Sequence, residues 1–375
     1  MKPAIPKPLP PTGLDWKALI PQIGSANRAL AHYDGVLQVM PNPALLLSPL
    51  TTNEAVLSSR IEGTRATLGD VLKFEAGEEV QEETRRLDIQ EIINYRRALY
   101  SAEETLRRRP FNLNMLRELH AILLDGVRGR DKGRGQFRMV QNYIAPPGAG
   151  IEQALFIPPE PMRVMELMDN WEKYYHANEP DALVQLGLVH AQFEIIHPFV
   201  DGNGRLGRML VPLFLFERRI LSRPTFYLSE YFEGHRDQYY TLLRALDGPK
   251  AWDRWVAFFL RALTEQALAN IDKARAILDL HAHLKEQMIA LTRSQFAVPL
   301  LDQMFRQPIF APSSLYGIRG MPSKPMVMEL LRTLRRAGIL KVLREASGRR
   351  SQILMLTELI RLSERKTSPR NTRDG

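Results

Sequence analysis

The chain has 375 residues, of which 45% are hydrophobic and 25% charged, and it contains no cysteine. This composition excludes a wholly disordered chain, a disulfide framework, a thiolate metal site and a cysteine nucleophile. Residues 1–13 hold five prolines where an export signal would need an apolar run. The longest apolar run, Met209 to Phe216, is too short to cross a bilayer. We therefore expect a cytoplasmic protein without a membrane partner.

The net charge of +9 is concentrated in the last quarter of the chain. Residues 281–375 contain 17 Lys and Arg against 7 Asp and Glu, whereas residues 1–280 contain 34 against 35. This asymmetry predicts that the C-terminal part meets an anion, with nucleic acid as the favoured partner. A basic, solvated surface is the alternative.

In chain order, the residue pattern predicts a mainly α-helical protein. Residues 131–161 interrupt it with four glycines and five prolines, and we interpret this stretch as a loop that carries a β-hairpin formed by Met139–Ile144 and Ala154–Ile157. The predicted helices are Glu78–Arg109, Met115–Leu124, Met162–His176, Asp181–Ile196, Gly204–Arg219, Glu230–Leu246 and Trp252–Leu291.

The run from His197 to Arg208 carries the chemistry. Pro198 disfavours helical geometry at His197, so a helix should end there and leave the imidazole at a loop edge. Residues 201–204 (Asp-Gly-Asn-Gly) have the composition of a tight turn, and a second apolar helix follows directly. Free backbone N–H groups at the start of that helix would form an anion-binding nest.

The side chains around this nest suit a magnesium–nucleotide site. Arg205 and Arg208 are three residues apart and share one face of the first turn. Asp201 supplies a hard carboxylate for a magnesium ion that keeps most of its waters. His197 supplies a base that can titrate near neutral pH. Residues 202–207 also fit G-x-G-x-x-G, but the preceding sequence is helical and not a strand, which argues against a dinucleotide fold.

The segment His197-Pro198-Phe199-Val200-Asp201-Gly202-Asn203-Gly204-Arg205-Leu206-Gly207-Arg208 resembles the HPFx[DE]GNGRxxR motif of the Fic family, whose fixed positions all match. The resemblance implies a helical core with a small β-hairpin flap, which transfers AMP from ATP to a protein hydroxyl. It implies that His197 deprotonates the hydroxyl and that Asp201 holds Mg²⁺. The ATP-binding residues that it implies are Gly202, Asn203, Gly204, Arg205, Leu206, Gly207 and Arg208, with Arg205 at the β-phosphate and Arg208 at the γ-phosphate.

Two neighbouring segments extend the resemblance, and two single residues on the preceding helix also need an interpretation. Residues 135–140 and 156–159 resemble the segments around the family's flap, which holds a target peptide by strand addition. Residues 228–240 resemble the family's following helix, in which His235 stands where members often have Asn near the adenine. His190 is expected to be structural, and Glu194 either orients a neighbour or faces solvent.

Upstream, Ser58-Ser59-Arg60-Ile61-Glu62-Gly63 resembles the [ST]xxxE[GN] inhibitory motif of one class of Fic proteins. On a helix, Ser58 and Glu62 share a face, and Gly63 supplies a natural stop. The resemblance implies that Glu62 pairs with Arg208 and occupies the space that the γ-phosphate needs. The alternative is a capping box formed by Ser59 and Glu62.

The basic C-terminal part is similar to a winged helix. Its predicted elements are helix Val298–Met304, a turn at Ser313–Tyr316, helix Lys324–Ala337, and β-pieces Lys341–Arg344 and Gln352–Leu356. Such a module can place a helix in the major groove with wing arginines at phosphates, or bind protein instead. The predicted regions are a proline-rich lead and N-terminal segment (1–50), a helical region with the inhibitory motif (51–110), the Fic core (111–250), a linking helix (251–291), the winged helix (292–364) and a polar tail (365–375).

The function expected from these features is a self-inhibited protein adenylyltransferase. It would use Mg²⁺ and ATP, and its targets would be hydroxyl groups of another protein or of itself. Two alternatives stay open: a DNA-binding regulator whose Fic core senses nucleotide, and a Fic enzyme of related chemistry (UMP transfer or AMP removal). A homodimer is a further open alternative.

Overall fold

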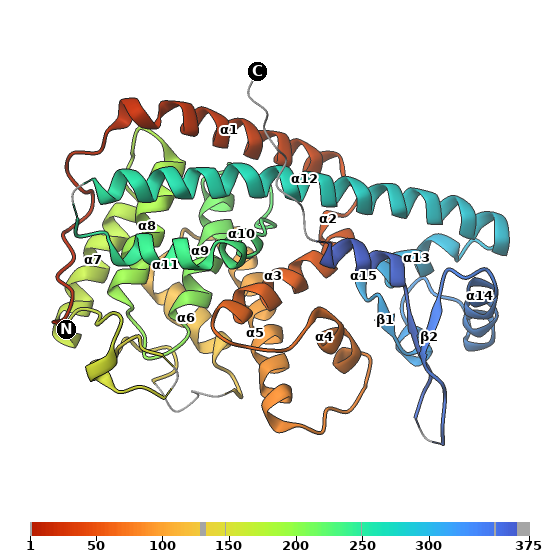
Figure 1. Ribbon diagram of the computed structural model, residues 1–375. Helices are drawn as coiled ribbons and strands as arrows, with labels where there is room; N and C mark the ends of the chain where they lie inside the picture. The colour runs from red at the N-terminus through yellow and green to blue at the C-terminus, as the bar shows by residue number, and fades with distance from the viewer. Residues whose placement is uncertain (1, 128–132, 147, 249, 349, 366–375) are drawn as a thin grey trace.

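The computed structural model describes residues 2–127, 133–146, 148–248, 250–348 and 350–365. A long helix, α12 (Ala251–Thr292), runs along the molecule and joins a large helical part to the smaller C-terminal part (Figure 1). No helix within the described ranges is long and apolar enough to cross a membrane.

The elements of the large part are mostly helices. They are α1 (Trp16–Val39), α2 (Pro43–Leu46), α3 (Ser48–Ile61), α4 (Leu68–Glu75), α5 (Glu83–Leu106), α6 (Leu113–Leu123), the short 3₁₀ helices Ile151–Gln153 and Pro161–Arg163, α7 (Val164–Tyr175), α8 (Ala182–Ile196), α9 (Asn203–Glu217), α10 (Ser229–Gly234) and α11 (Arg236–Arg244).

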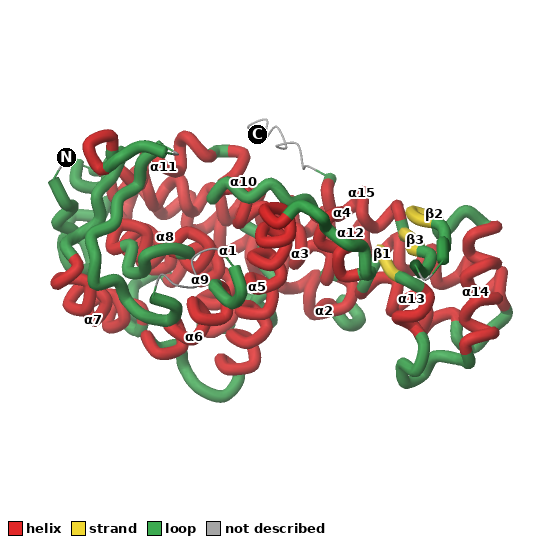
Figure 2. The backbone as a smooth tube through the Cα atoms, turned by 90° about the horizontal axis from the view of Figure 1, so that it is seen from below, coloured by secondary structure: helices red, strands yellow, loops and turns green. Residues whose placement is uncertain are grey.

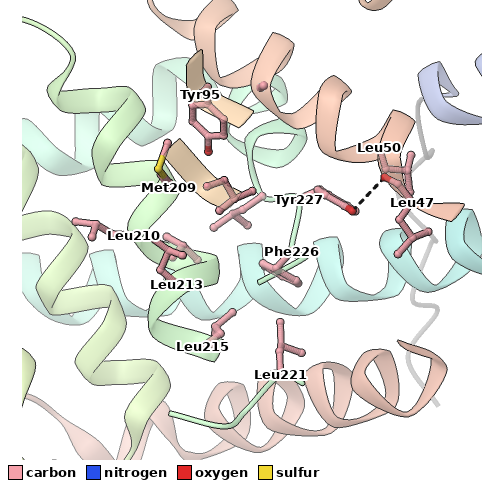
Figure 3. Packing of buried hydrophobic residues seen from close by; sticks show 14 of the residues in the cluster. Leu47, Leu50, Tyr95, Met209, Leu210, Leu213, Leu215, Leu221, Phe226 and Tyr227 are labelled. Carbon is pink, nitrogen blue, oxygen red and sulfur yellow. Dashed lines mark hydrogen bonds between the residues drawn. The ribbon is translucent and has the colours of Figure 1, made fainter. Parts of the chain in front are cut away.

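Helix α8 lies at the centre of this part, since its residues are buried on every face, three polar ones (Gln185, His190 and Gln192) among them. Asp181 caps its start by accepting hydrogen bonds from the backbone N–H groups of Leu183 and Val184, both at 2.9 Å. Helix α9 packs beside it, and its residues Met209, Leu210 and Leu213 point into the core (Figure 3). The close packing of α8 and α9 fixes the loop that connects them.

The N-terminal segment, predicted only as a proline-rich lead, contains the 24-residue helix α1, which lies along α12 (Figure 1). Its buried residues recur every three or four positions, which a helical periodicity search of residues 16–39 would detect. The proline-rich lead itself is anchored to the fold. Ala4 N–H donates to the carbonyl of Ile157 at 2.8 Å, and Leu9 N–H donates to Asn170 Oδ1 at 2.8 Å.

Three predicted elements differ from the structure. The helix predicted over 78–109 begins only at Glu83, and the helix predicted over 230–246 is two helices that break at His235. The two flap segments meet through one antiparallel bridge between Ile144 and Phe156. A bridge of this kind leaves the backbone of residues 139–143 outside any ladder of the described chain, because the many prolines and glycines of the loop limit strand pairing.

The C-terminal part combines helices with a small sheet, seen at one end of the molecule (Figure 2). Its strands are ordered β1-β3-β2, and both pairs are antiparallel. Strand β1 and helix α15 were not predicted; β1 is two residues long, too short for an alternating pattern. The elements are α13 (Ala297–Arg306), β1 (Ile309–Phe310), the 3₁₀ helix Pro312–Leu315, α14 (Lys324–Arg336), β2 (Lys341–Arg344), β3 (Ile353–Met355) and α15 (Thr357–Glu364). Arg349 and the tail 366–375 lie outside the described residues.

Candidate active site

The loop between α8 and α9 is a rigid turn. His197 caps α8 in the left-handed conformation, with φ of 51°, and its N–H donates to Phe193 O at 2.9 Å. Asn203 closes the turn, because its Oδ1 accepts from Phe199 N–H and its Nδ2 donates to Phe199 O, both at 2.8 Å. Gly202 adopts φ of 81°, which disfavours any side chain there.

The start of α9 is an anion-binding nest. The backbone N–H groups of Asn203, Gly204 and Arg205 have no hydrogen-bond partner in the described part of the chain, as expected for the first turn of a helix. They carry the positive end of the helix dipole. The geometry therefore suits phosphate oxygens, although the Asn203 side chain serves the turn and not the ligand.

Arg205 and Asp201 lie together beside the nest. Arg205 Nη2 is 3.3 Å from Asp201 Oδ1, and Arg205 Nη1 donates to Glu91 Oε2 of α5 at 2.8 Å. Glu91 was not predicted, because nothing in the sequence pairs it with a residue 114 positions later. Its carboxylate holds the Arg205 guanidinium, which is almost fully buried, at the loop.

Arg208 is bound to the segment that resembles an inhibitory motif, residues 58–63. Its Nη2 donates to Glu62 Oε1 at 2.7 Å and to Ser58 O at 2.8 Å, and its Nε donates to Ser58 Oγ at 3.0 Å. A Cβ added at Gly204 would lie only 2.1 Å from Glu62 Oε1. The Glu62 carboxylate therefore rests against the first turn of α9, where an anionic ligand of the nest would bind.

Glu62 is placed by the end of α3. The helix ends at Ile61, Glu62 is its C-cap, and Gly63 turns the chain with φ of 99°. The capping-box alternative is excluded, since a capping box requires a helix to begin at Ser59. Burial alone would raise the pKa of Glu62, but the charge and hydrogen bond of Arg208 outweigh this effect and lower the pKa. Glu62 is therefore an anion at neutral pH.

His197 is held as a neutral base. Burial, the largest effect, lowers the pKa of His197 to about 4. Its Nδ1 lies 3.4 Å from Glu194 O, and a hydrogen on Nδ1 would leave Nε2 to accept a proton. A half-buried neutral imidazole at a loop edge can act as a general base without first losing a proton.

This pKa predicts an unusual pH profile for any reaction in which His197 is the base. Down to pH 5 the rate should hold, because an imidazole with a pKa of about 4 is still roughly nine-tenths neutral there. An ordinary histidine would lose most of its neutral form below pH 6. The pH–rate profile of the Glu62→Gly protein measures this, and an acidic limb centred near pH 6.5 would contradict it.

Arg138 anchors the loop between α8 and α9. Arg138 lies in the flap segment, but the sequence did not indicate this role. It is 2% exposed, and its guanidinium donates to His197 O at 2.9 Å, to Ile196 O at 3.3 Å and to Val140 O at 3.3 Å. A further bond to the carbonyl of Pro159 ties the other side of the flap. Arg138 therefore joins the base of the flap to the backbone of the catalytic loop.

Replacing Arg138 by methionine should lower the free energy of unfolding by about 3 kcal/mol or more, because several buried carbonyls lose their donor together. Arg138→Lys should recover part of this loss. The matched control is Arg108→Met, since that side chain is 80% exposed and its replacement should change little. Urea unfolding followed by circular dichroism measures all three, and equal effects at the two positions would contradict the assignment.

His120 and Phe199 hold the loop from the side of α6. Their rings stack with centroids 3.8 Å apart, and His120 Nε2 is 3.0 Å from Asp201 O. Gly135 N–H donates to His120 Nδ1 at 2.9 Å. Burial lowers the pKa of His120 to about 4, so the ring is neutral and can bridge these two backbone groups.

Other predicted residues lie away from the nest. Leu206 is fully buried and its N–H bonds to Gly202 O, while Gly207 packs against Phe193 and Glu194. Neither therefore presents a free group for the predicted contact with ATP. His235 stacks on Tyr231 and lines a separate cavity that no residue of 197–208 lines.

The structure shows the contacts of His190 and Glu194, the two residues of α8 considered in the sequence analysis. His190 is buried and bonds to Gly207 O and to the Tyr239 hydroxyl, both at 3.0 Å, which is a structural role. Glu194 lies against Gly207, and its Oε1 is buried without a hydrogen-bond partner in the described ranges. Burial raises the pKa of Glu194 to about 8, so it is mostly uncharged at pH 7.

The donor set suits a magnesium ion carried by a nucleotide. The described residues contain no cluster of three or more His, Cys, Asp or Glu side chains that would form a metal cage. One carboxylate beside a phosphate nest is how Mg²⁺ is commonly held, because waters and phosphate oxygens complete its shell. Asp201 fits that role.

Comparisons with known proteins show the family of this chain. The sequence matches the description "Fic/DOC family N-terminal" over residues 20–104 and "Fic/DOC family" over residues 110–215. The chain belongs to the Fic family. A "Probable protein adenylyltransferase" of Aquifex aeolicus is 37% identical over 70 residues, which are 18% of this chain and 22% of that protein. The "Protein adenylyltransferase Fic" of Drosophila melanogaster is 34% identical over 104 residues, which are 26% of this chain and 18% of that protein. The match to this chain thus spans about a fifth of the length of these relatives.

Solved Fic structures share the fold. A Fic family protein from Desulfovibrio desulfuricans G20 has a TM-score of 0.58 and 21% identity, and the match covers 94% of this chain and 98% of that one. A Fic domain containing signaling protein from Bacteroides thetaiotaomicron has a TM-score of 0.53 and 18% identity, over 69% and 96% of the two chains. The first match extends over nearly the whole chain, so the helical Fic fold is shown, while a winged-helix assignment remains a prediction.

Proposed function

We propose that this Fic protein transfers AMP from ATP to a hydroxyl group of a target protein and that Glu62 inhibits it. The observation that carries the proposal is the Glu62–Arg208 pair, 2.7 Å long, which lies against a phosphate nest beside a neutral His197. A carboxylate bound to Arg208 would inhibit the protein only if the nest and Arg208 bind an anionic substrate.

Residues of the loop and of the first turn of α9 have distinct roles in the proposed reaction. The target oxygen attacks the α-phosphorus, His197 accepts its proton, and the bond from the α-phosphorus to the departing pyrophosphate breaks. The N–H groups of Asn203, Gly204 and Arg205 hold the phosphates, and Arg205 and Arg208 neutralise their charge. Bound at Asp201, Mg²⁺ would supply further charge neutralisation.

A target peptide is proposed to bind beside the flap. Apolar side chains of the flap are exposed, among them Met139 at 86% and Val140 at 58%. The backbone of residues 139–143 can accept an added strand, since the described residues of the flap pair only through the Ile144–Phe156 bridge. The names of the relatives support AMP transfer as the chemistry, whereas UMP transfer and AMP removal use the same phosphate contacts and are alternatives.

Incubation with ATP and Mg²⁺ tests the proposal. We expect mass spectrometry to find AMP on Ser, Thr or Tyr hydroxyls of target proteins or of the protein itself, at higher occupancy with the Glu62→Gly protein. Parallel incubation with UTP, or with a target that already carries AMP, distinguishes the related chemistries. ATP binding without any transfer by the Glu62→Gly protein would instead support a nucleotide sensor.

DNA binding by the C-terminal part is a second proposal, supported by the basic charge of residues 281–375. We expect weak binding that falls roughly 100-fold or more between 50 and 200 mM salt, if the predicted arginines Arg332, Arg335, Arg336, Arg349 and Arg350 each contact a phosphate. Arg332 already pairs with Glu329, and Arg350 lies 3.2 Å from Glu79, so phosphates must compete with these carboxylates. A gel shift of the full chain at low salt that shows no complex would favour protein contact.

A further inference from the structure

A cavity of about 980 Å³ lies on the side of α3 that faces away from Arg208. Its walls come from α1, α3, α4, α10, α12 and α15, and in Figure 1 α10 and α15 lie below α12 while α1 lies above it. This volume is at the upper end of the range typical of sites for small molecules. None of the residues 197–208 lines it, so it is separate from the nest.

One wall of the cavity is formed by α12. Its lining residues include Leu268 and Ala269, which lie between the carboxylates of Glu265 and Asp272; the others are Arg261, Thr264 and Gln266. Because seven residues make two helical turns, the two carboxylates lie on one face about 10 Å apart, with apolar side chains between them. The matching ligand is an aliphatic chain with a positive charge toward each end.

Helix α10 contributes Tyr231 and Glu233 to the lining. Tyr231 is only 7% exposed. Burial, reinforced by the charge of Glu265, raises the pKa of Tyr231 to about 12, so its hydroxyl is uncharged at neutral pH. Glu233 Oε2 is buried without a hydrogen-bond partner in the described part of the chain. A buried carboxylate oxygen of this kind normally finds a donor.

The charged groups of the lining favour a cation. Arg60, Arg261 and His235 are its basic side chains, and Glu230 is bonded to Lys273 at 2.5 Å. The carboxylates that line the cavity are Glu230, Glu233, Glu265, Asp272 and Glu364. The carboxylates outnumber the arginines, and they occur on three different helices.

We propose that this cavity binds an elongated aliphatic polyamine. One ammonium group would bind at Glu265, with Glu233 and the Tyr231 hydroxyl as further acceptors, and the other would bind at Asp272. The methylene chain between them would lie on Leu268 and Ala269. Charge-assisted hydrogen bonds at both ends give such a ligand its specificity over a simple amine.

The cavity is connected to the inhibitory motif, a step that rests on the proposed function. Leu57 and Arg60 of α3 line the cavity, while Ser58 and Glu62 contact Arg208 from the other side of the helix end. Arg236, next to His235, donates to Ile61 O at 2.6 Å and joins α11 to the end of α3. A ligand that fits the cavity while Glu62 is on Arg208 stabilises that arrangement over any in which α3 has moved. Polyamine binding therefore strengthens inhibition.

Calorimetry of the full chain with spermidine tests the site. Spermidine should bind with one-to-one stoichiometry, and propylamine, with one ammonium group, at least tenfold more weakly. Glu265→Gln should weaken spermidine binding at least tenfold. Glu286→Gln, at an exposed position of the same helix, is the matched control and should leave the affinity unchanged. Absent binding, or equal effects of the two variants, would overturn the site.

Transfer of AMP measured with and without spermidine tests the regulation. Spermidine should lower the rate of the intact protein at least threefold and leave Glu62→Gly and Glu265→Gln unaffected. Equal inhibition of all three proteins would overturn the regulatory step, because it would show an effect on ATP itself. Calorimetric binding without AMP transfer by any variant would contradict the proposed function while supporting the site, so the two failures are distinguishable.

Discussion

Replacing Glu62 by glycine should raise AMP transfer, including self-modification, on the order of tenfold to a hundredfold. In the structure, Glu62 occupies Arg208 and lies against Gly204. On the proposed mechanism, ATP bound beside this carboxylate would lose its contact with Arg208, and its α-phosphate would be out of line with the incoming oxygen. Alignment supplies much of the rate in a displacement at phosphorus, so removing the carboxylate should act through productive binding. Incorporation of label from α-labelled ATP measures the change.

Two further variants separate this mechanism from a change in helix stability. Arg208→Ala in the Glu62→Gly background should cancel the gain, since the arginine is then missing from the nucleotide. Glu62→Gln removes the charge with little change of shape and should give an intermediate rate. If Glu62 only stabilised the end of α3, its loss would cost roughly 1 kcal/mol of stability and leave the rate unchanged or lower. That outcome would leave inhibition without support.

Replacing His197 by alanine in the Glu62→Gly background should reduce AMP transfer on the order of 1,000-fold, toward background. In the proposed reaction His197 is the base for the incoming hydroxyl, whereas backbone N–H groups and arginines of α9 would hold the phosphates. Magnesium–ATP binding, measured by calorimetry, should therefore change less than threefold. Loss of ATP binding together with activity would overturn the assignment of His197 as base.

A matched change in helix α8 provides a control for this test. His190→Ala removes a histidine that is two turns earlier on α8 and bonds to Gly207 O and the Tyr239 hydroxyl. We expect it to lower the thermal stability and to leave the transfer rate of the folded fraction within about threefold, because the ring lies in the core. A loss as large as that of His197→Ala would show that activity depends on packing of α8 and not on a base.

Local sequence determined much of this protein. The proline after His197 and the glycines after Asp201 set the end of α8 and the start of α9, because both act on the backbone of their own neighbours. The apolar pattern of α8 likewise determined a buried helix. Features of this kind depend on a few consecutive residues, which is why they could be predicted without the fold.

Other elements needed the tertiary structure. Strand β1 exists because two residues pair with β3, and the break at His235 occurs where α10 and α11 pack separately. Neither has a local signal, since pairing and packing are made with distant residues. The flap shows the same dependence, because Arg138 ties its backbone at Val140 and Pro159 to the loop at His197.

The candidate site divides in the same way. The sequence by itself determined which residues form the loop from His197 to Arg208, and a motif match carried the expected pairing of Glu62 with Arg208. Only the tertiary structure decided that Glu91 holds Arg205, that Arg138 supports the loop, and that His235 faces a different cavity. Such contacts join residues far apart in the chain, and the free energy of packing the helices decides which side chains meet. A single sequence without its fold does not contain that information in local form.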